Sequence, residues 1–224
     1  MSGSERPGSR DLTFRTVRIE VPRSARYLVA GGEEEPRELW VVLHGYSMLA
    51  EEGLRWFAPV VTPRRRVVAP EALNRYYTNH ELKKVGATWM TREDREAEIR
   101  DYVRYLDLVL AELTAELPQP ARLEVHGFSQ GATTAARWIA LGAVRPARLV
   151  LWGGGLPPDL ALEDARERLN AADLTLVIGD RDKYIDEARI AAESARMTEA
   201  GLRFTLRRFR GGHVVPWTEL ADGR

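Results

Sequence analysis

Short hydrophobic runs, separated by polar turns, recur along most of this chain. Residues 39–45, "LWVVLHG", and residues 174–180, "LTLVIGD", are nearly continuous apolar runs that end at a glycine or an acidic residue. Such runs are typical of strands in a parallel sheet, which helices cover on both faces. The same pattern predicts strands at 66–72, at the run that ends at Gly127, at 147–155 and at 203–209.

The first part of the chain has a different pattern. Residues 14–21, "FRTVRIEV", alternate apolar and polar side chains, and residues 25–31, "ARYLVAG", follow after a turn that contains proline. Alternation of this kind is typical of half-buried strands, so the two segments are expected to form an N-terminal antiparallel hairpin. The preceding residues are polar, and we expect a disordered tail at 1–12 and one domain over 13–224.

Helical periodicity separates the strands. A long helix is predicted from Thr91, with Asp94 three residues later as a capping-box signal, to Pro118. Further helices are expected within 49–59, after Ser129, at 159–169, at 185–200 and at the end of the chain. Residues 73–90 lack periodicity and are predicted to form a long, partly ordered surface loop. The order of elements predicts an α/β fold, with a mostly parallel central sheet, helices on both faces and no large lid domain.

Composition narrows the classes of function. The 224 residues hold 33 basic and 33 acidic side chains, so no overall charge attracts nucleic acid or an anionic membrane. No apolar run approaches the roughly 18 residues of a membrane span. The chain has no cysteine, which excludes disulfides, thiolate catalysis and cysteine-bound zinc. The histidines are too dispersed for a metal site, so we expect no bound metal. We also expect a cytoplasmic protein that has no cofactor.

The segment "LEVHGFSQGATTAARWIAL", residues 123–141, has a composition that points to chemistry. It contains Gly127-Phe128-Ser129-Gln130-Gly131, between an apolar run and a helix-forming run. Gly-x-Ser-x-Gly alone is a weak signal, and a structural turn is the alternative. At a strand-to-helix junction, however, it is typical of a sharp turn that exposes a nucleophilic serine. Ser129 is therefore the candidate nucleophile.

A catalytic serine needs a base and an acid. Of the four histidines, only His213 follows Ser129, in the chain order serine, acid, histidine that this kind of turn uses. His126 precedes the turn and is expected to be structural. Asp180 and Asp182, at the end of the strand predicted for 174–180, are both candidates for the acid, and their spacing does not separate them. Asp180 has the alternative role of holding the turn by binding backbone N–H groups.

An oxyanion hole is expected beside the serine. The backbone N–H of Gln130, directly after the nucleophile, is one expected donor, and the N–H of Tyr46 in "LHGYS" is the other. Tyr46 and Trp89 are predicted to line the substrate pocket, because such pockets are mostly apolar and both residues lie near expected strand ends.

Taken together, these motifs resemble the α/β-hydrolase superfamily, and within it the phospholipase/carboxylesterase family, which includes acyl-protein thioesterases. The similar features are the strand ending in His-Gly, the Gly-Phe-Ser-Gln-Gly turn, Gly-x-x-Asp after a late strand, Gly-x-His near the end, and "LVLWGGGLPPDL". The resemblance covers about residues 38–220. It implies Ser129 as nucleophile, His213 as base, Tyr46 and Gln130 as oxyanion donors and, three residues after Gly179, Asp182 as the acid.

The expected activity is that of a serine esterase acting on small to medium carboxylic esters, as a monomer or a homodimer. Thioester or lysophospholipid hydrolysis and acyl or peroxide transfer by the same residues are the alternatives among enzymes. A non-catalytic α/β-hydrolase that binds a ligand is the alternative of another class. No membrane span and no nucleic-acid partner are expected.

Overall fold

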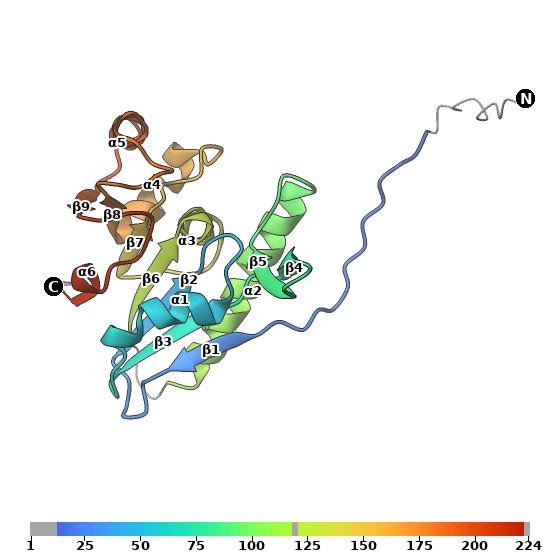
Figure 1. The fold of residues 1–224 in the computed structure, drawn as a ribbon, viewed down its shortest axis with the longest axis horizontal. Helices are drawn as coiled ribbons and strands as arrows, with labels where there is room; N and C mark the ends of the chain where they lie inside the picture. The colour runs from blue at the N-terminus through green and yellow to red at the C-terminus, as the bar shows by residue number, and fades with distance from the viewer. Residues whose placement is uncertain (1–12, 118–120, 222–224) are drawn as a thin grey trace, which may run out of the picture.

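The computed structural model of the chain describes residues 13–117 and 121–221. Its centre is a seven-stranded sheet with the order β1-β3-β2-β6-β7-β8-β9 (Figure 1). β1 pairs antiparallel with β3, and the other neighbouring strands pair in parallel. The strands are β1 (Tyr27–Ala30), β2 (Glu38–Leu43), β3 (Arg65–Pro70), β6 (Arg122–Phe128), β7 (Arg148–Trp152), β8 (Asp173–Gly179) and β9 (Thr205–Phe209).

Alternate residues of the central strands enter two separate cores. On β2, Leu39, Val41 and Leu43 belong to one buried cluster, and Trp40 and Val42 belong to the other. Both faces of the strand are therefore covered, which explains why its sequence is a continuous apolar run.

Helices cover the two faces of the sheet unequally. The larger core includes residues of α2 (Arg95–Ala115), α3 (Gln130–Leu141), α4 (Leu162–Ala171) and α5 (Glu187–Glu199). The smaller core includes residues of α1 (Ala50–Trp56), the 3₁₀ helix η1 (Ala58–Val60) and α6 (Trp217–Ala221). This α/β-hydrolase arrangement confirms the predicted fold class.

The predicted N-terminal hairpin is wrong in its pairing. Residues 14–21 form no strand; they run as an exposed, extended segment that leaves the body beyond β1 (Figure 1). β1 pairs with β3 instead, with Tyr27 opposite Pro70. The segment 14–21 has the alternating pattern of a strand, but it pairs with no strand among the described residues.

The prediction of a surface loop at 73–90 is also wrong, because this segment forms an antiparallel hairpin. β4 (Asn74–Asn79) pairs with β5 (Lys84–Thr88), with an irregularity between Tyr77 and Asn79. The polar strands leave most side chains of β4 exposed, so the hydrophobic pattern that marks a buried strand is absent. An isolated β-bridge between Met48 and Ala87 connects this hairpin to the loop that follows β2.

The long helix begins later than predicted. α2 starts at Arg95, and Asp94 is its N-cap with a left-handed φ of 48° and no side-chain cap bond. Thr91 instead bonds to Glu93 and Glu98, which orders the turn before the helix. The expected end at Pro118 and the expected tail at 1–12 lie outside the described residues.

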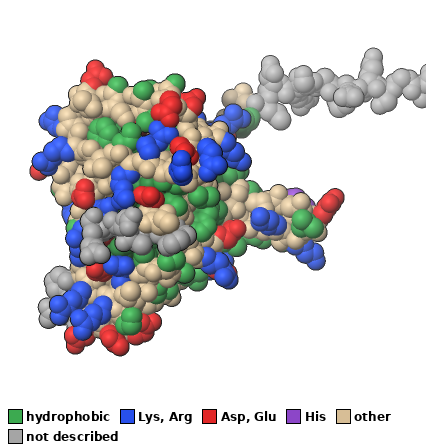
Figure 2. All heavy atoms as spheres, turned by 60° about the vertical axis from the view of Figure 1, so that its left-hand side comes forward, with side chains coloured by type: hydrophobic (Ala, Val, Ile, Leu, Met, Phe, Trp, Pro, Cys, Tyr) green, Lys and Arg blue, Asp and Glu red, His purple; other side chains and the backbone are tan. Residues whose placement is uncertain are grey.

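The surface shows no dominant sign of charge in the face of Figure 2, where basic and acidic side chains are interspersed. Within the described ranges, no helix has both the length and the apolar composition needed to cross a membrane.

Candidate active site

Ser129 lies at the junction of β6 and α3. It is the N-cap residue of α3, with φ of 54° and ψ of −115°, a backbone conformation that a residue with a side chain rarely adopts. Its N–H donates to the carbonyl of Trp152 on the neighbouring strand at 2.9 Å, which anchors the turn. The strained turn directs Ser129 out of the regular strand, at the positive end of a helix.

The glycines around Ser129 are required by close backbone approach. A Cβ on Gly127 would lie 2.2 Å from the carbonyl oxygen of Gly131, and a Cβ on Gly131 would lie 2.1 Å from that of Leu43. Neither atom can move without shifting a strand or a helix. The Gly-x-Ser-x-Gly spacing is therefore a consequence of packing α3 against β2 and β6.

His213 lies close to the same turn. Its ring packs on Phe128, the residue before Ser129, with 4.7 Å between ring centroids. A Cβ on Gly153 would lie 3.0 Å from His213 Nδ1, and a Cβ on Gly154 would lie 2.9 Å from the Ser129 carbonyl oxygen. The imidazole thus lies against Phe128 and Gly153, the residues directly before Ser129 and directly after β7.

Asp182 holds the other side of the imidazole. His213 Nδ1 donates to Asp182 Oδ2 at 2.7 Å, and the carboxylate is fully buried. Its Oδ1 accepts the N–H of Tyr184 at 2.9 Å. With Nδ1 used as a donor, Nε2 is the ring nitrogen left to accept a proton in neutral His213.

Asp180 has a different position. Its Oδ1 accepts the backbone N–H of Gly211 at 2.9 Å, and its side chain is 45% exposed beside Arg181. It ties the turn after β8 to the segment that carries His213. Of the two carboxylates that their spacing leaves open, Asp182 bonds to the imidazole, whereas Asp180 bonds to a backbone N–H.

The predicted oxyanion residues lie at the ends of β2 and β6. Gln130 is the first residue of α3, where backbone N–H groups lack intrahelical partners. Tyr46 follows Gly45 after β2, and its side chain is 57% exposed. Its ring packs against Tyr76 with 5.7 Å between centroids. Figure 1 places the ends of β2 and β6 side by side, as their parallel register requires.

The β4–β5 hairpin holds the loop that carries Tyr46. Ser47 has a left-handed φ of 63°, its N–H donates to Ala87, and its hydroxyl bonds to the hydroxyl of Tyr76 at 2.5 Å. A Cβ on Gly86 would lie 2.3 Å from the Ser47 carbonyl oxygen, so hairpin and loop are in direct contact. Sequence reasoning missed Tyr76, because its role depends on a hairpin that has no apolar signature.

The side chain of Gln130 binds the segment that directly follows β5. Its Oε1 accepts the N–H of Trp89 at 3.1 Å, and its Nε2 donates to the carbonyl of Met90 at 2.8 Å. Thr88 also bonds to this amide. One residue therefore supplies a backbone donor at the turn and connects the turn to the segment after β5.

Trp89 occupies the core and not the surface of a pocket. It is 1% exposed, and its Nε1 donates to the carbonyl of His44 at 2.9 Å. This position argues against the predicted pocket role and makes Trp89 a support for the end of β2. Tyr184 is a pocket candidate in place of Trp89: it is 55% exposed, and its ring packs against His213 in a T-shaped arrangement.

Two other histidines are buried and structural. Burial lowers the pKa of His44, whose Nδ1 bonds to the Gly45 carbonyl and whose Nε2 accepts the N–H of Ala72. Burial likewise lowers the pKa of His126, which stacks on Trp40 and whose Nδ1 accepts from Trp152 Nε1 at 3.2 Å. Both rings are therefore favoured in the neutral form.

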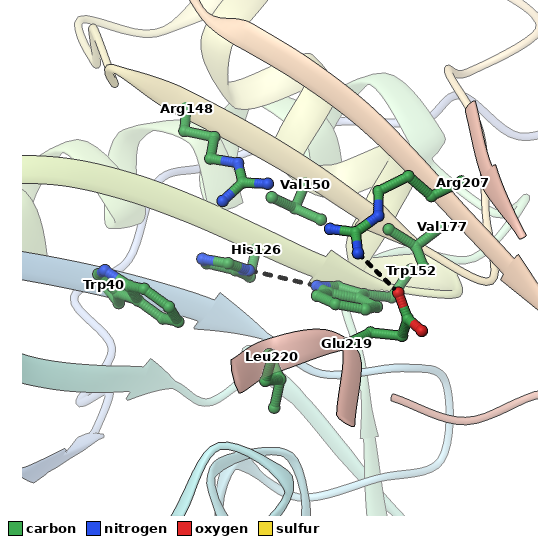
Figure 3. A pocket seen from close by; sticks show the side chains of 9 residues that line it. All are labelled: Trp40, His126, Arg148, Val150, Trp152, Val177, Arg207, Glu219 and Leu220. Atoms are coloured by element: carbon green, nitrogen blue, oxygen red, sulfur yellow. Dashed lines mark hydrogen bonds and ion pairs between the residues drawn. The ribbon is translucent and has the colours of Figure 1, made fainter. Parts of the chain in front are cut away.

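His126 lines a small cavity between the sheet and α6 (Figure 3). The ion pair of Arg207 with Glu219 lies at its edge, at 2.9 Å. Ser129, Asp182 and His213 do not line this cavity. Over residues 13–117 and 121–221, no three histidine, aspartate or glutamate side chains form a group that could hold a metal ion.

Comparison with protein families gives a match to a serine hydrolase family. The family model described as "Serine hydrolase (FSH1)" matches residues 58–222. No curated protein matches the chain in sequence.

Several solved structures share the fold. Esterase PE8 has a TM-score of 0.65 and 22% identity, over 89% of this chain and 94% of that chain. Acyl-protein thioesterase 2 from Zea mays has a TM-score of 0.66 and 17% identity, over 89% and 96%. A carboxylesterase from Mesorhizobium loti has a TM-score of 0.67 and 16% identity, over 89% and 95%.

Proposed function

The chain belongs to the serine hydrolase (FSH1) family, and we propose that it is a carboxylesterase that cleaves small to medium carboxylic esters through an acyl-enzyme intermediate. The proposal depends most on one observation. The imidazole of His213 is held by the buried carboxylate of Asp182 beside the strained turn at Ser129. The proposed nucleophile, base and acid thus follow β6, β9 and β8, respectively, and their proposed roles are those of a serine hydrolase triad.

In the proposed mechanism, Ser129 Oγ attacks the ester carbonyl while its proton passes to His213 Nε2. The N–H groups of Tyr46 and Gln130 stabilise the oxyanion. The imidazolium then protonates the departing alcohol, which leaves an ester between Ser129 and the acyl group. Water, deprotonated by His213, attacks this ester and releases the acid. Asp182 orients the ring and stabilises its charged form throughout.

The substrate class follows from the surroundings of His213. Tyr46 and Tyr184 are both more than half exposed: Tyr46 is a proposed oxyanion donor, and the ring of Tyr184 packs on His213. The β4–β5 hairpin packs against the Tyr46 loop, and the described residues contain no large inserted lid. An open, aromatic-flanked serine favours small or medium esters over long-chain lipid aggregates. The fold neighbours described as an esterase, a carboxylesterase and an acyl-protein thioesterase support acyl-transfer chemistry to water.

The decisive experiment is hydrolysis of p-nitrophenyl acetate and butyrate by the wild-type protein and by Ser129→Ala. We expect the variant to lose nearly all activity and to lose labelling by a fluorophosphonate probe. Ser194→Ala, a serine on α5 far along the sequence from the turn, is the matched control and should keep both. Full activity of Ser129→Ala, or labelling of another serine, would refute the proposal.

A series of p-nitrophenyl esters and matching thioesters of increasing acyl length then defines the substrate. We expect the highest kcat/KM for short or medium oxygen esters. A preference for thioesters would leave the proposed residues in place and change only the leaving group. Preference for emulsified long-chain triglyceride would contradict the open site.

A further inference from the structure

The segment 14–21 presents an unusual amount of hydrophobic surface to solvent. Phe14, Val17, Ile19 and Val21 are 87%, 69%, 82% and 69% exposed. Val17, Ile19 and Val21 occupy every second position, so in an extended chain they share one face. Four large apolar side chains on one arm are the pattern of a strand whose covering surface lies elsewhere.

A matching strand edge exists at β1. In the seven-stranded sheet β1 is the first strand, so its outer edge has no strand partner among the described residues. Edges of this kind readily accept another strand, because a row of backbone N–H and C=O groups is unpaired. Val29, on β1, is 48% exposed.

The side of α2 next to β1 adds a second exposed apolar residue. Tyr105 on α2 donates its hydroxyl to the carbonyl of Arg26 at 2.9 Å, and Glu112 interacts with Tyr27. Leu108 lies between Tyr105 and Glu112 on the same side of the helix, and it is 63% exposed. A strand added outside β1 would cover Leu108 and Val29 with its apolar face.

The arm does not fold back onto its own β1. The carbonyl of Arg26 also accepts the N–H of Glu71 at 3.1 Å, which continues the β1–β3 pairing beyond Tyr27. Arg23 bonds to the carbonyl of Leu73 and to the side chain of Asn74. These contacts keep residues 23–26 extended along the end of β3 where a hairpin would require a turn.

Within the described part of the chain, the contacts of residues 14–21 with the body are two exposed ion pairs. Arg18 pairs with Asp94 at 2.5 Å, and Glu20 pairs with Arg104 at 3.4 Å, all with side chains at least 45% exposed. Exposed ion pairs contribute little stability, so they do not compensate for four solvated apolar side chains.

We propose that two copies of this chain exchange their arms, so that residues 14–21 of each copy pair antiparallel with the outer edge of β1 of the other. Because arm and β1 form one extended segment, a two-fold axis near Arg23 makes both pairings equivalent, which closes the dimer. The register that keeps the apolar face inward places Val17 opposite Val29 and Ile19 opposite Tyr27. Pro22, which has no N–H, falls near the axis, between the two paired regions.

The proposal is tested with engineered cysteines, which are the only thiols because the chain has none of its own. Residues directly opposite in an antiparallel pair have Cα atoms at about 4.5–5.5 Å, within the range for a disulfide. Val17→Cys mixed with Val29→Cys should give a disulfide-linked dimer of one of each, and the double variant should give a covalent dimer. Thr16→Cys mixed with Val29→Cys is the matched control and should not crosslink, since Thr16 lies on the opposite face.

The mass in solution provides the second measurement. Light scattering should show a dimer for the wild type, and Ile19→Asp should raise the dimer dissociation constant by about 100-fold or more, because two buried side chains are lost per dimer. Thr16→Asp should remain dimeric, and esterase activity should persist in both variants. A monomeric wild type, an intramolecular disulfide in the double Val17→Cys/Val29→Cys variant, or a dimer insensitive to Ile19→Asp would each overturn the exchange.

Discussion

His213 Nδ1 and Asp182 Oδ2 lie 2.7 Å apart, and the Asp182 side chain has no exposed surface. A buried carboxylate that accepts one imidazole N–H and one backbone N–H is held in a single orientation. It therefore fixes both the direction of the ring and the nitrogen that faces away from it. Asp180, two residues earlier, instead accepts the backbone N–H of Gly211.

This difference predicts opposite outcomes for two similar substitutions. Asp182→Asn keeps the size of the side chain but favours the wrong tautomer of His213, so kcat should fall on the order of 10⁴-fold. Asp180→Asn retains an oxygen that can accept the Gly211 N–H, and kcat should change less than about three-fold. The measurement is steady-state hydrolysis of p-nitrophenyl butyrate. Equal losses in the two variants would contradict the assignment of Asp182 as the acid.

The contact of Tyr76 with Ser47 predicts that the β4–β5 hairpin supports the loop that carries Tyr46, a proposed oxyanion donor. Tyr76→Phe removes the hydroxyl that bonds to Ser47, whose φ is left-handed, so the loop should relax. A hydrogen bond of this kind contributes about 1 kcal/mol, and we expect a loss of about five-fold in kcat.

Tyr77→Phe is the matched control for Tyr76→Phe. The ring of Tyr77 packs near His80 and is 54% exposed, away from the loop. Its kcat should equal that of the wild type. If Tyr76→Phe retains full kcat while Tyr77→Phe does not, the hairpin does not act through Ser47.

The close approach at Gly131 predicts a large loss of stability on adding one methyl group. Gly131→Ala places a Cβ 2.1 Å from a backbone oxygen of β2, so α3 must shift, and the free energy of unfolding should fall by at least about 2 kcal/mol. In Gly212→Ala the nearest atom to the new Cβ is 3.7 Å away, which is ordinary contact. Urea denaturation of the two variants should show destabilisation of the first only.

Burial of His44 predicts a loss of stability in mild acid. Its pKa is lowered below the usual value of 6.5 because burial penalises the charged ring, and Nε2 already accepts the N–H of Ala72. The unfolded chain therefore binds more protons below pH 6.5, and the stability that neutral His44 contributes is lost as pH falls through the lowered pKa.

The measurement is the free energy of unfolding as a function of pH for the wild type and for His44→Gln. Between pH 8 and 7 the two curves should run parallel, and below 6.5 the wild type should lose stability faster, by up to about 1.4 kcal/mol per pH unit. His126 is buried too and remains in both proteins, so it cancels in the difference. Parallel curves throughout would show that His44 does not titrate on unfolding.

Elements of this fold can be predicted from the sequence where a local pattern of apolar residues is enough to identify them. Continuous apolar runs predict β2 and β8 because those strands are buried on both faces. The helical period predicts α2, although the capping signal at Thr91 misplaces its start by several residues because Thr91 bonds to Glu98 instead. The hairpin β4–β5 escapes prediction because its stability comes from the Ser47 loop and Gln130, not from a hydrophobic face of its own.

The sequence by itself determined which serine stands between a strand and a helix, because the apolar run before Ser129, the Gly-x-Ser-x-Gly spacing and the helix-forming run after it are local features of the chain. It also determined that His213 is the only histidine that follows. The spacing of Asp180 and Asp182 left the acid open and only the family resemblance favoured Asp182, whereas the tertiary structure shows Asp182 bonded to the imidazole. Only the tertiary structure decided that Trp89 is core and that residues 14–21 leave the body of the molecule. Those outcomes depend on which surfaces meet in the folded chain. Two aspartates on one turn have the same local sequence whichever of them meets the histidine. An alternating segment likewise has the same pattern whether or not a neighbouring strand is present.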